Sequence, residues 1–267
     1  MQIKKVYGMY FRPTQNTKKI VETICSTLNI ESEYIDLTNP SIRKQTHTFT
    51  SEDLVVVGVP TYAGRIPNKI VDDLKQNLMG NQTFLIGLVT YGNRNYDSSL
   101  AELVSILENQ NFYTIAACAI VCEHAFTNRL ATHRPNEEDL NTIASFARKV
   151  QSKMDAYKFH EEKTNVQVEP YYIPLRQDGS PARFLKAKPK TDLTICTDCK
   201  KCAQVCPMQS IDWKDVSLVS GICIKCQACI QVCDVHAKYF DDEDFLSHVK
   251  MLEENYSMHK ENQFWMR

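Results

Sequence analysis

The stretch Leu54-Val55-Val56-Val57-Gly58-Val59 is a continuous apolar run in the N-terminal half of the chain. No polar residue alternates with the apolar ones, as it would in a strand with one face in solvent. A β-branched run of this kind is typical of a central parallel strand that is buried on both faces. The stretch therefore predicts an α/β sheet with helices packed on both sides.

Strand-like and helix-like stretches alternate on either side of this run, from Gln2 to about Val150. Further strands are expected at 3–9, 34–37, 83–90 and 112–122, and helices at 17–28, 66–78 and 98–109. Another helix should begin after Asn136, which has the character of an N-cap followed by acidic residues, and should run to about Phe159. Five strands that alternate with helices predict a doubly wound five-stranded parallel sheet in the order 2-1-3-4-5.

Three loops that follow predicted strands carry residues suited to hold a ligand. They span 10–17, 59–67 and 90–97. Because ligands of such sheets bind beyond the carboxyl ends of the strands, all three loops should meet at one edge. The 10–17 loop precedes a helix and offers hydroxyl and amide groups that can cradle a phosphate. In the 59–67 loop, Gly64 allows the backbone to approach a ring closely.

The 10–17 loop resembles the phosphate loop of flavodoxins. Its matching residues are Thr14, Asn16 and Thr17. Pro13 lacks an N–H donor, and Gln15 stands where the family commonly has glycine. Two interpretations stay open: either Arg12 compensates with a direct charge-assisted bond to the phosphate, or the loop no longer binds a phosphate.

The 59–67 and 90–97 loops resemble the flavin-flanking loops of flavodoxins, especially those of bacterial flavodoxin–ferredoxin fusion proteins. The resemblance implies an FMN cofactor with Tyr62 and Tyr96 beside the isoalloxazine, and backbone hydrogen bonds from Gly92 and Asn93. The candidate cofactor-binding residues are Arg12, Thr14, Gln15, Asn16, Thr17, Pro60, Thr61, Tyr62, Ala63, Gly64, Thr90, Tyr91, Gly92, Asn93 and Tyr96.

Eight of the 11 cysteines fall in two runs near the C-terminus. The runs are Cys196-x2-Cys199-x2-Cys202-x3-Cys206-Pro207 and Cys223-x2-Cys226-x2-Cys229-x3-Cys233. Thiolates at this spacing can wrap a [4Fe-4S] cube, and the fourth cysteine of each run is expected to ligate the other cube. The predicted ligand sets are Cys196, Cys199, Cys202 and Cys233 for cluster A, and Cys206, Cys223, Cys226 and Cys229 for cluster B. Zinc sites and disulfides are the alternatives, but zinc motifs rarely repeat this spacing and disulfides need an oxidising compartment.

Both runs resemble those of bacterial-type two-cluster [4Fe-4S] ferredoxins, which implies a small α+β ferredoxin domain. One departure is Asp234, which stands where a proline usually follows the last cysteine. The other three cysteines, Cys25, Cys118 and Cys122, are expected to be core residues without chemistry. His124 is favoured as a structural hydrogen-bonding residue over a proton donor to a flavin.

Composition excludes several functional classes. The net charge of −1 gives no indication of nucleic-acid binding. No apolar run approaches the ~20 residues of a membrane span, and the N-terminus is too short and polar for a secretory signal. Free thiols and clusters then predict a cytoplasmic protein.

The whole chain resembles the flavodoxin–ferredoxin fusion family, also called EFR-type ferredoxins. The predicted divisions are 1–160 for a flavodoxin-like FMN domain, 161–190 for an ordered connector, 191–240 for a two-[4Fe-4S] ferredoxin domain, and 241–267 for a helix and tail. The resemblance implies an intracellular electron carrier that passes electrons between two [4Fe-4S] clusters and FMN and works with redox partner proteins. Two alternatives stay open: a flavin-dependent reductase of a small molecule, and a ferredoxin whose flavodoxin-like half is a flavin-free docking domain.

Overall fold

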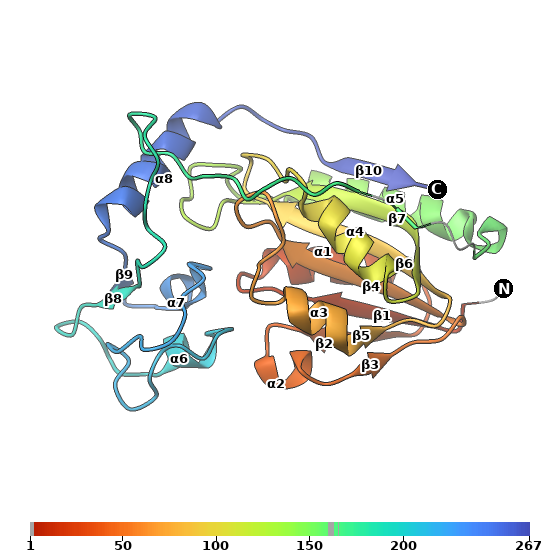
Figure 1. Cartoon of the computed structure of the whole chain (residues 1–267), viewed down its shortest axis with the longest axis horizontal. Helices are drawn as coiled ribbons and strands as arrows, with labels where there is room; N and C mark the ends of the chain where they lie inside the picture. The colour runs from red at the N-terminus through yellow and green to blue at the C-terminus, as the bar shows by residue number, and fades with distance from the viewer. Residues whose placement is uncertain (1–2, 160–162, 165) are drawn as a thin grey trace.

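The computed structural model describes residues 3–159, 163, 164 and 166–267 (Figure 1). Met1, Gln2 and the predicted domain boundary at 160–161 lie outside the described residues. The larger part of the chain is built on one mostly parallel sheet. Its strands are β1 (Lys5–Tyr10), β2 (Ser32–Asp36), β4 (Asp53–Pro60), β6 (Thr83–Tyr91), β7 (Phe112–Val121) and β10 (Gln263–Met266).

The five predicted strands lie in the predicted order. The sheet runs β10-β7-β6-β4-β1-β2, and the five strands from β7 to β2 are parallel neighbours. This is the flavodoxin-like doubly wound order with β4 at its centre. In β4, Leu54 and Val56 join one buried cluster, whereas Val55, Val57 and Val59 join the other. The strand is therefore buried on both faces, as its apolar run predicts.

Helices cover both faces of the sheet (Figure 1). They are α1 (Asn16–Thr27) and α5 (Glu137–Ser152) on one face, and α3 (Val71–Asn77) and α4 (Ser99–Glu108) on the other. The predicted cap of α5 is confirmed: Asn136 and Asp139 form a capping box. The helix predicted from Ile66 begins only at Val71, because the residue before Pro67 is pushed out of the helical region. The helix predicted to reach Phe159 ends at Ser152 and is followed by a short 3₁₀ turn (Met154–Ala156).

The prediction of a five-stranded sheet is wrong by one strand. β10 pairs antiparallel with the edge strand β7, so the sheet has six strands. Figure 1 shows the chain leaving α8 (Glu243–Asn255) and running back along the sheet to reach β10. Phe264 packs against the α5 side, with its ring 4.9 Å from that of Phe146.

A small module with two short helices carries the eight C-terminal cysteines (Figure 1). Its elements are β8 (Lys190–Thr191), α6 (Lys201–Gln204), α7 (Ala228–Gln231) and β9 (Lys238–Tyr239), and we call residues 190–239 the cysteine module. β8 pairs antiparallel with β9, and a single bridge joins Ile211 to Val219.

Three smaller elements complete the fold. The helix α2 (Pro40–Arg43) has Asn39 as its cap, and β3 (His47–Thr48) pairs with β5 (Leu78–Met79). Among the described residues, no helix is long and apolar enough to cross a membrane.

Candidate functional site

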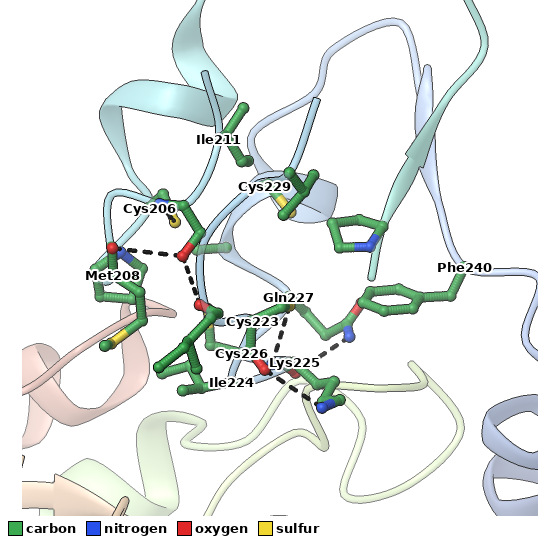
Figure 2. A pocket seen from close by; sticks show the side chains of 16 residues that line it. Cys206, Met208, Ile211, Cys223, Ile224, Lys225, Cys226, Gln227, Cys229 and Phe240 are labelled. Atoms are coloured by element: carbon green, nitrogen blue, oxygen red, sulfur yellow. Dashed lines mark hydrogen bonds between the residues drawn. The ribbon is translucent and has the colours of Figure 1, made fainter. Parts of the chain in front are cut away.

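Cysteines from both runs line one cavity in the cysteine module (Figure 2). They are Cys206, Cys223, Cys226 and Cys229. Apolar side chains such as Ile211 and Phe240 complete the walls, and the space measures about 380 Å³ with open solvent included. Cys206 follows α6, whereas the other three surround the start of α7. The structure thus brings together the four residues of the predicted cluster B set.

Lys201 lies near two cysteines of the predicted cluster A set, one from each run. Its ammonium group pairs with the Asp234 carboxylate, which raises the pKa of Lys201, and the thiolates of Cys199 and Cys233 contribute in the same direction. Lys201 therefore lies near the second cysteine of the first run, Cys199, and the last cysteine of the second run, Cys233. Cys196 packs against the apolar cluster that contains Cys202. Asp234 thus forms an ion pair where the family commonly has proline.

The two runs have the same backbone geometry. Left-handed residues precede both helices, with φ of 61° at Lys200 and 65° at Gln227. These two positions are equivalent, because each lies four residues after the first cysteine of its run. Backbone N–H groups also donate to equivalent sulfurs, from Ser210 to Cys206 at 3.3 Å and from Ala237 to Cys233 at 3.2 Å. Such N–H···S bonds stabilise thiolates and tune iron–sulfur clusters.

The two runs differ in their environment. Burial raises the pKa of the Cys226 thiol to about 12 and also raises that of Cys229. A backbone hydrogen bond from Lys201 lowers the pKa of the exposed Cys199 thiol. In the ranges that the structure describes, no three His, Cys, Asp or Glu side chains are arranged to hold a metal ion. The sulfurs of a cube bind four separate irons, so they do not converge on one point.

The 10–17 loop ends at an uncapped helix N-terminus. No side chain caps α1, no acidic residue lies in its first turn, and no backbone N–H of residues 14–18 donates to another described residue. Free N–H groups of this kind can bind a phosphate. The Thr17 hydroxyl lies 3.1 Å from that of Thr90.

Arg12 does not point freely into this loop. Its Nε and Nη2 donate to the Asp36 carboxylate on β2, at 3.0 and 2.7 Å. The role of Arg12 as a phosphate ligand stays a prediction, and the guanidinium is partly committed to Asp36. The residues of the loop fit the phosphate end of FMN through backbone donors at α1.

The 59–67 loop is held tightly against the 90–97 loop. Tyr62 forms a bridge with Arg65, and the Thr61 hydroxyl lies 2.7 Å from that of Ser99. Gly64 has a φ of 79°, and a Cβ there would lie 2.3 Å from a carboxylate oxygen of Asp97. The glycine is therefore needed both for its conformation and for its lack of a side chain.

The two predicted flavin tyrosines have different surroundings. Tyr62 is half-buried, and desolvation raises its pKa well above its ordinary value; Cys226 and Cys223 add to the effect, which indicates that both cysteines lie near Tyr62. Tyr96 instead packs between the rings of Tyr91, at 5.3 Å, and Trp265, at 6.3 Å. Among the described residues, no contact joins Tyr62 to Tyr96.

The cysteine module touches the edge of the sheet through Ile224. This residue follows Cys223 and packs against the buried cluster that contains Ile66 and Val59. Figure 2 places Ile224 and Met208 on the side of the cavity that faces the loops of the sheet. The cavity with Cys206, Cys223, Cys226 and Cys229 is therefore the one next to the predicted flavin loops.

The remaining sequence candidates are structural. Cys25, Cys118 and Cys122 are buried in the core beside α1 and α5, as predicted. His124 accepts a hydrogen bond from the Phe126 N–H at 3.1 Å, and burial lowers its pKa to about 4. A neutral, half-buried His124 that accepts a backbone hydrogen bond has a structural role, as the sequence favours.

The sequence analysis predicts an ordered connector and a C-terminal helix and tail, but it does not predict that both segments contact these loops. The N–H of Tyr172 in the connector donates to the Ala63 carbonyl at 2.8 Å. The Asn93 amide on the 90–97 loop donates to the Met258 carbonyl of the tail at 2.9 Å. In the sequence, the apolar end Phe264-Trp265-Met266 is a signal for a packed tail, and the aromatic pair Tyr171-Tyr172 is one for a packed connector.

Comparison with solved structures finds flavodoxins. One from the domain Archaea is 14% identical over 57% of this chain and 99% of its own, with a TM-score of 0.38. A flavodoxin of Streptococcus pneumonia TIGR4 is 16% identical over 56% of this chain and 99% of its own, with a TM-score of 0.40. The rubredoxin oxygen:oxidoreductase of Desulfovibrio gigas is 16% identical over 58% of this chain and 37% of its own, with a TM-score of 0.38.

No protein-family model and no curated protein matches the sequence. Because the TM-scores are below 0.5, the flavodoxin-like fold is assigned from the strand order and not from these likenesses.

Proposed function

We propose that this protein is an electron carrier that passes electrons between two [4Fe-4S] clusters in the cysteine module and FMN at the edge of the sheet. One observation carries the proposal. The cavity lined by Cys206, Cys223, Cys226 and Cys229 adjoins the carboxyl ends of the parallel strands, where Tyr62 and Ile224 lie between module and sheet. A carrier needs its centres close together and shielded from water.

The residues of the chain supply the binding and the positioning. The eight cysteines would hold the clusters in the crossed sets, with Cys206 and Cys233 exchanged between runs. The N–H groups at the start of α1 would hold the FMN phosphate. The 59–67 and 90–97 loops would flank the ring, and the remaining candidate residues keep the roles predicted from the sequence. FMN, when bound, accepts one or two electrons, so the chain would link one-electron and two-electron partners.

Partner proteins would meet the cluster A side of the module. Cys199 is exposed there, and so are Leu193 and Ile195, which are 67% and 47% exposed. An electron donor or acceptor could approach this side, whereas the cluster B side is taken up by the sheet. Clusters with exposed cysteines need a reducing compartment, in agreement with the predicted cytoplasmic location.

The decisive experiment begins with protein purified without oxygen. Iron, sulfide and released flavin are quantified, and the proposal expects about eight irons and one FMN per chain. The clusters are then reduced by a flash at several protein dilutions while flavin bleaching is followed. In a carrier with fixed centres, the rate is independent of concentration. A rate that scales with concentration shows transfer between molecules and contradicts the proposal.

A flavin-free docking domain is the second candidate. The Arg12–Asp36 ion pair favours it, because this guanidinium is committed to a carboxylate of the chain. Titration of the apoprotein with FMN and with riboflavin separates the two functions. A carrier binds FMN more tightly than riboflavin through the α1 N-terminus, and a docking domain binds neither.

A further inference from the structure

Two segments that lie far apart in the sequence cover the 59–67 and 90–97 loops. One is connector residues 169–172, and the other is tail residues 256–263; we call them together the clasp. Figure 1 shows both segments running along the same side of the sheet.

The connector joins the two loops to each other. Tyr172 N donates to the Ala63 carbonyl at 2.8 Å, and Arg65 Nη1 donates to the Glu169 carbonyl at 3.1 Å. The Glu169 N–H donates to the Ser98 hydroxyl at 3.1 Å, just beyond the 90–97 loop. Four connector residues thus bridge the ends of β4 and β6.

The tail is fixed to the 90–97 loop along its length. The Asn93 amide donates to the carbonyls of Tyr256 and Met258, and Lys260 Nζ donates to the Arg94 carbonyl. Tyr96 donates its hydroxyl proton to Gln263 at 2.6 Å. The tail therefore holds the middle of the loop, at Asn93, Arg94 and Tyr96.

The two halves of the clasp meet at Arg94. Its guanidinium lies 3.9 Å from the centre of the Tyr172 ring, a cation–π contact between connector and loop. The loops themselves are joined by the Ser98 N–H, which donates to the Gly64 carbonyl at 3.0 Å. The cysteine module packs against the same end of the sheet through Ile224.

We infer that the clasp selects the electron donor: it leaves this edge open to the clusters of the same chain and closes it to a soluble hydride donor such as a nicotinamide dinucleotide. The inference rests on the proposed function, since it requires FMN at this edge. A hydride donor must lie in contact with the flavin ring, whereas a single electron can cross a layer of protein. The clasp therefore favours the carrier over the small-molecule reductase.

The test loosens the clasp and measures access to the edge. The double variant Tyr171→Ala/Tyr172→Ala removes two cation–π contacts, with Arg65 at 4.8 Å and Arg94 at 3.9 Å. Tyr34→Ala is the control, because Tyr34 and Tyr171 are both 40% exposed and Tyr34 lies on β2, away from both loops. Hydrogen exchange of the two loops, FMN release and anaerobic reduction of bound FMN by NADH and NADPH are measured.

The amide hydrogens of both loops should exchange faster in the double variant. FMN release should be about tenfold faster, which corresponds to a loss of about 1.4 kcal/mol for the two cation–π contacts together. The flavin of the double variant should be reduced by NADH or NADPH, whereas the wild-type protein and Tyr34→Ala should not react. If the double variant does not fold, Lys260→Ala tests the tail half of the clasp alone.

Reduction of the wild-type flavin by NADH or NADPH at the rate of the double variant would overturn the inference. Unchanged hydrogen exchange and FMN release in the double variant and in Lys260→Ala would overturn it as well. A wild-type protein that contains iron but binds no FMN would instead overturn the proposed function, and the clasp with it. The two failures are therefore distinguishable.

Discussion

Cys206 belongs to the first cysteine run in sequence but lies with the second run in space. It lines the same cavity as Cys223, Cys226 and Cys229, and its sulfur accepts a backbone hydrogen bond from Ser210. In the proposed carrier, single residues of this kind would decide which cluster each part of the chain holds. Their substitution should therefore have a selective effect.

Replacement of Cys206 by alanine should damage the cluster held by the second run, and replacement of Cys233 should damage the other one. Each variant should lose iron, as measured by iron analysis and by the electron paramagnetic resonance of the reduced clusters. Cys25→Ala is the control, since Cys25 is buried beside α1 and should keep all its iron. Loss of the same signal in Cys206→Ala and Cys233→Ala would contradict the crossed ligation.

Gly64 should tolerate no side chain. Gly64→Ala forces a residue at φ 79° and places its Cβ 2.3 Å from an Asp97 oxygen. We expect a loss of about 1–3 kcal/mol in the free energy of unfolding, measured by urea denaturation. Gly179 is the matched control, with a φ of 83° and nothing within 4 Å of an added Cβ. Equal losses in the two variants would show that crowding against Asp97 contributes nothing.

His124 should make stability depend on pH. Burial lowers its pKa to about 4, with smaller contributions from His248 and Arg94, whereas an unfolded histidine has a pKa near 6.5. The unfolded state thus binds more protons between these values, so the free energy of unfolding should fall as the pH drops. We expect this residue to account for about 2 kcal/mol between pH 7 and pH 5.

The variant His124→Asn should remove that part of the pH dependence. Urea denaturation of both proteins at each pH gives the difference, in which every effect of acid that the two proteins share cancels. An identical pH dependence in the two proteins would rule out His124 as its source.

At the scale of elements, β10 extends the sheet at the edge strand β7. It pairs from Gln263 with Ala119 to Met266 with Ala116, and its alternate side chains face opposite sides. Phe264 packs on the α5 side against Phe146, whereas Trp265 lies toward Tyr96 and is 42% exposed. The strand therefore covers a sheet edge and anchors the tail.

Phe264→Ala should lower the free energy of unfolding by about 1–3 kcal/mol, because it leaves a gap beside Phe146 in a partly buried site. Urea denaturation measures the loss. Trp265→Ala should cost less, since much of this side chain already faces solvent. A larger loss for Trp265→Ala would mean that the β10 side chains contribute to stability in the opposite order.

At the scale of the whole molecule, the cysteine module docks on the sheet through Ile224. We expect Ile224→Lys to release the module, because it places an unpaired ammonium group in a partly buried, apolar contact. Small-angle X-ray scattering should show a larger radius of gyration, while the iron content stays unchanged. Ile222→Lys is the control, since Ile222 is 55% exposed. An unchanged radius for Ile224→Lys would show that other contacts hold the module.

Parts of the fold that depend on local pattern could be predicted from the amino-acid sequence. The apolar run 54–59 predicted a strand buried on both faces, and the alternation of strands and helices predicted the 2-1-3-4-5 order, because burial in a parallel sheet constrains every residue of a strand. The cysteine spacing likewise predicted that Cys206 joins Cys223, Cys226 and Cys229, and these four residues line one cavity. The assignment of all eight cysteines to two clusters stays a prediction.

Contacts between distant segments could not be predicted, because they depend on how the whole chain packs. β10 has four residues, too few for a periodic pattern, and becomes a strand only because β7 offers an unpaired edge. Arg12 binds Asp36 because β1 and β2 lie side by side, which the 10–17 loop does not encode. The clasp and the docking of Ile224 likewise depend on long-range packing, and such contacts leave no signal in the local sequence of either partner.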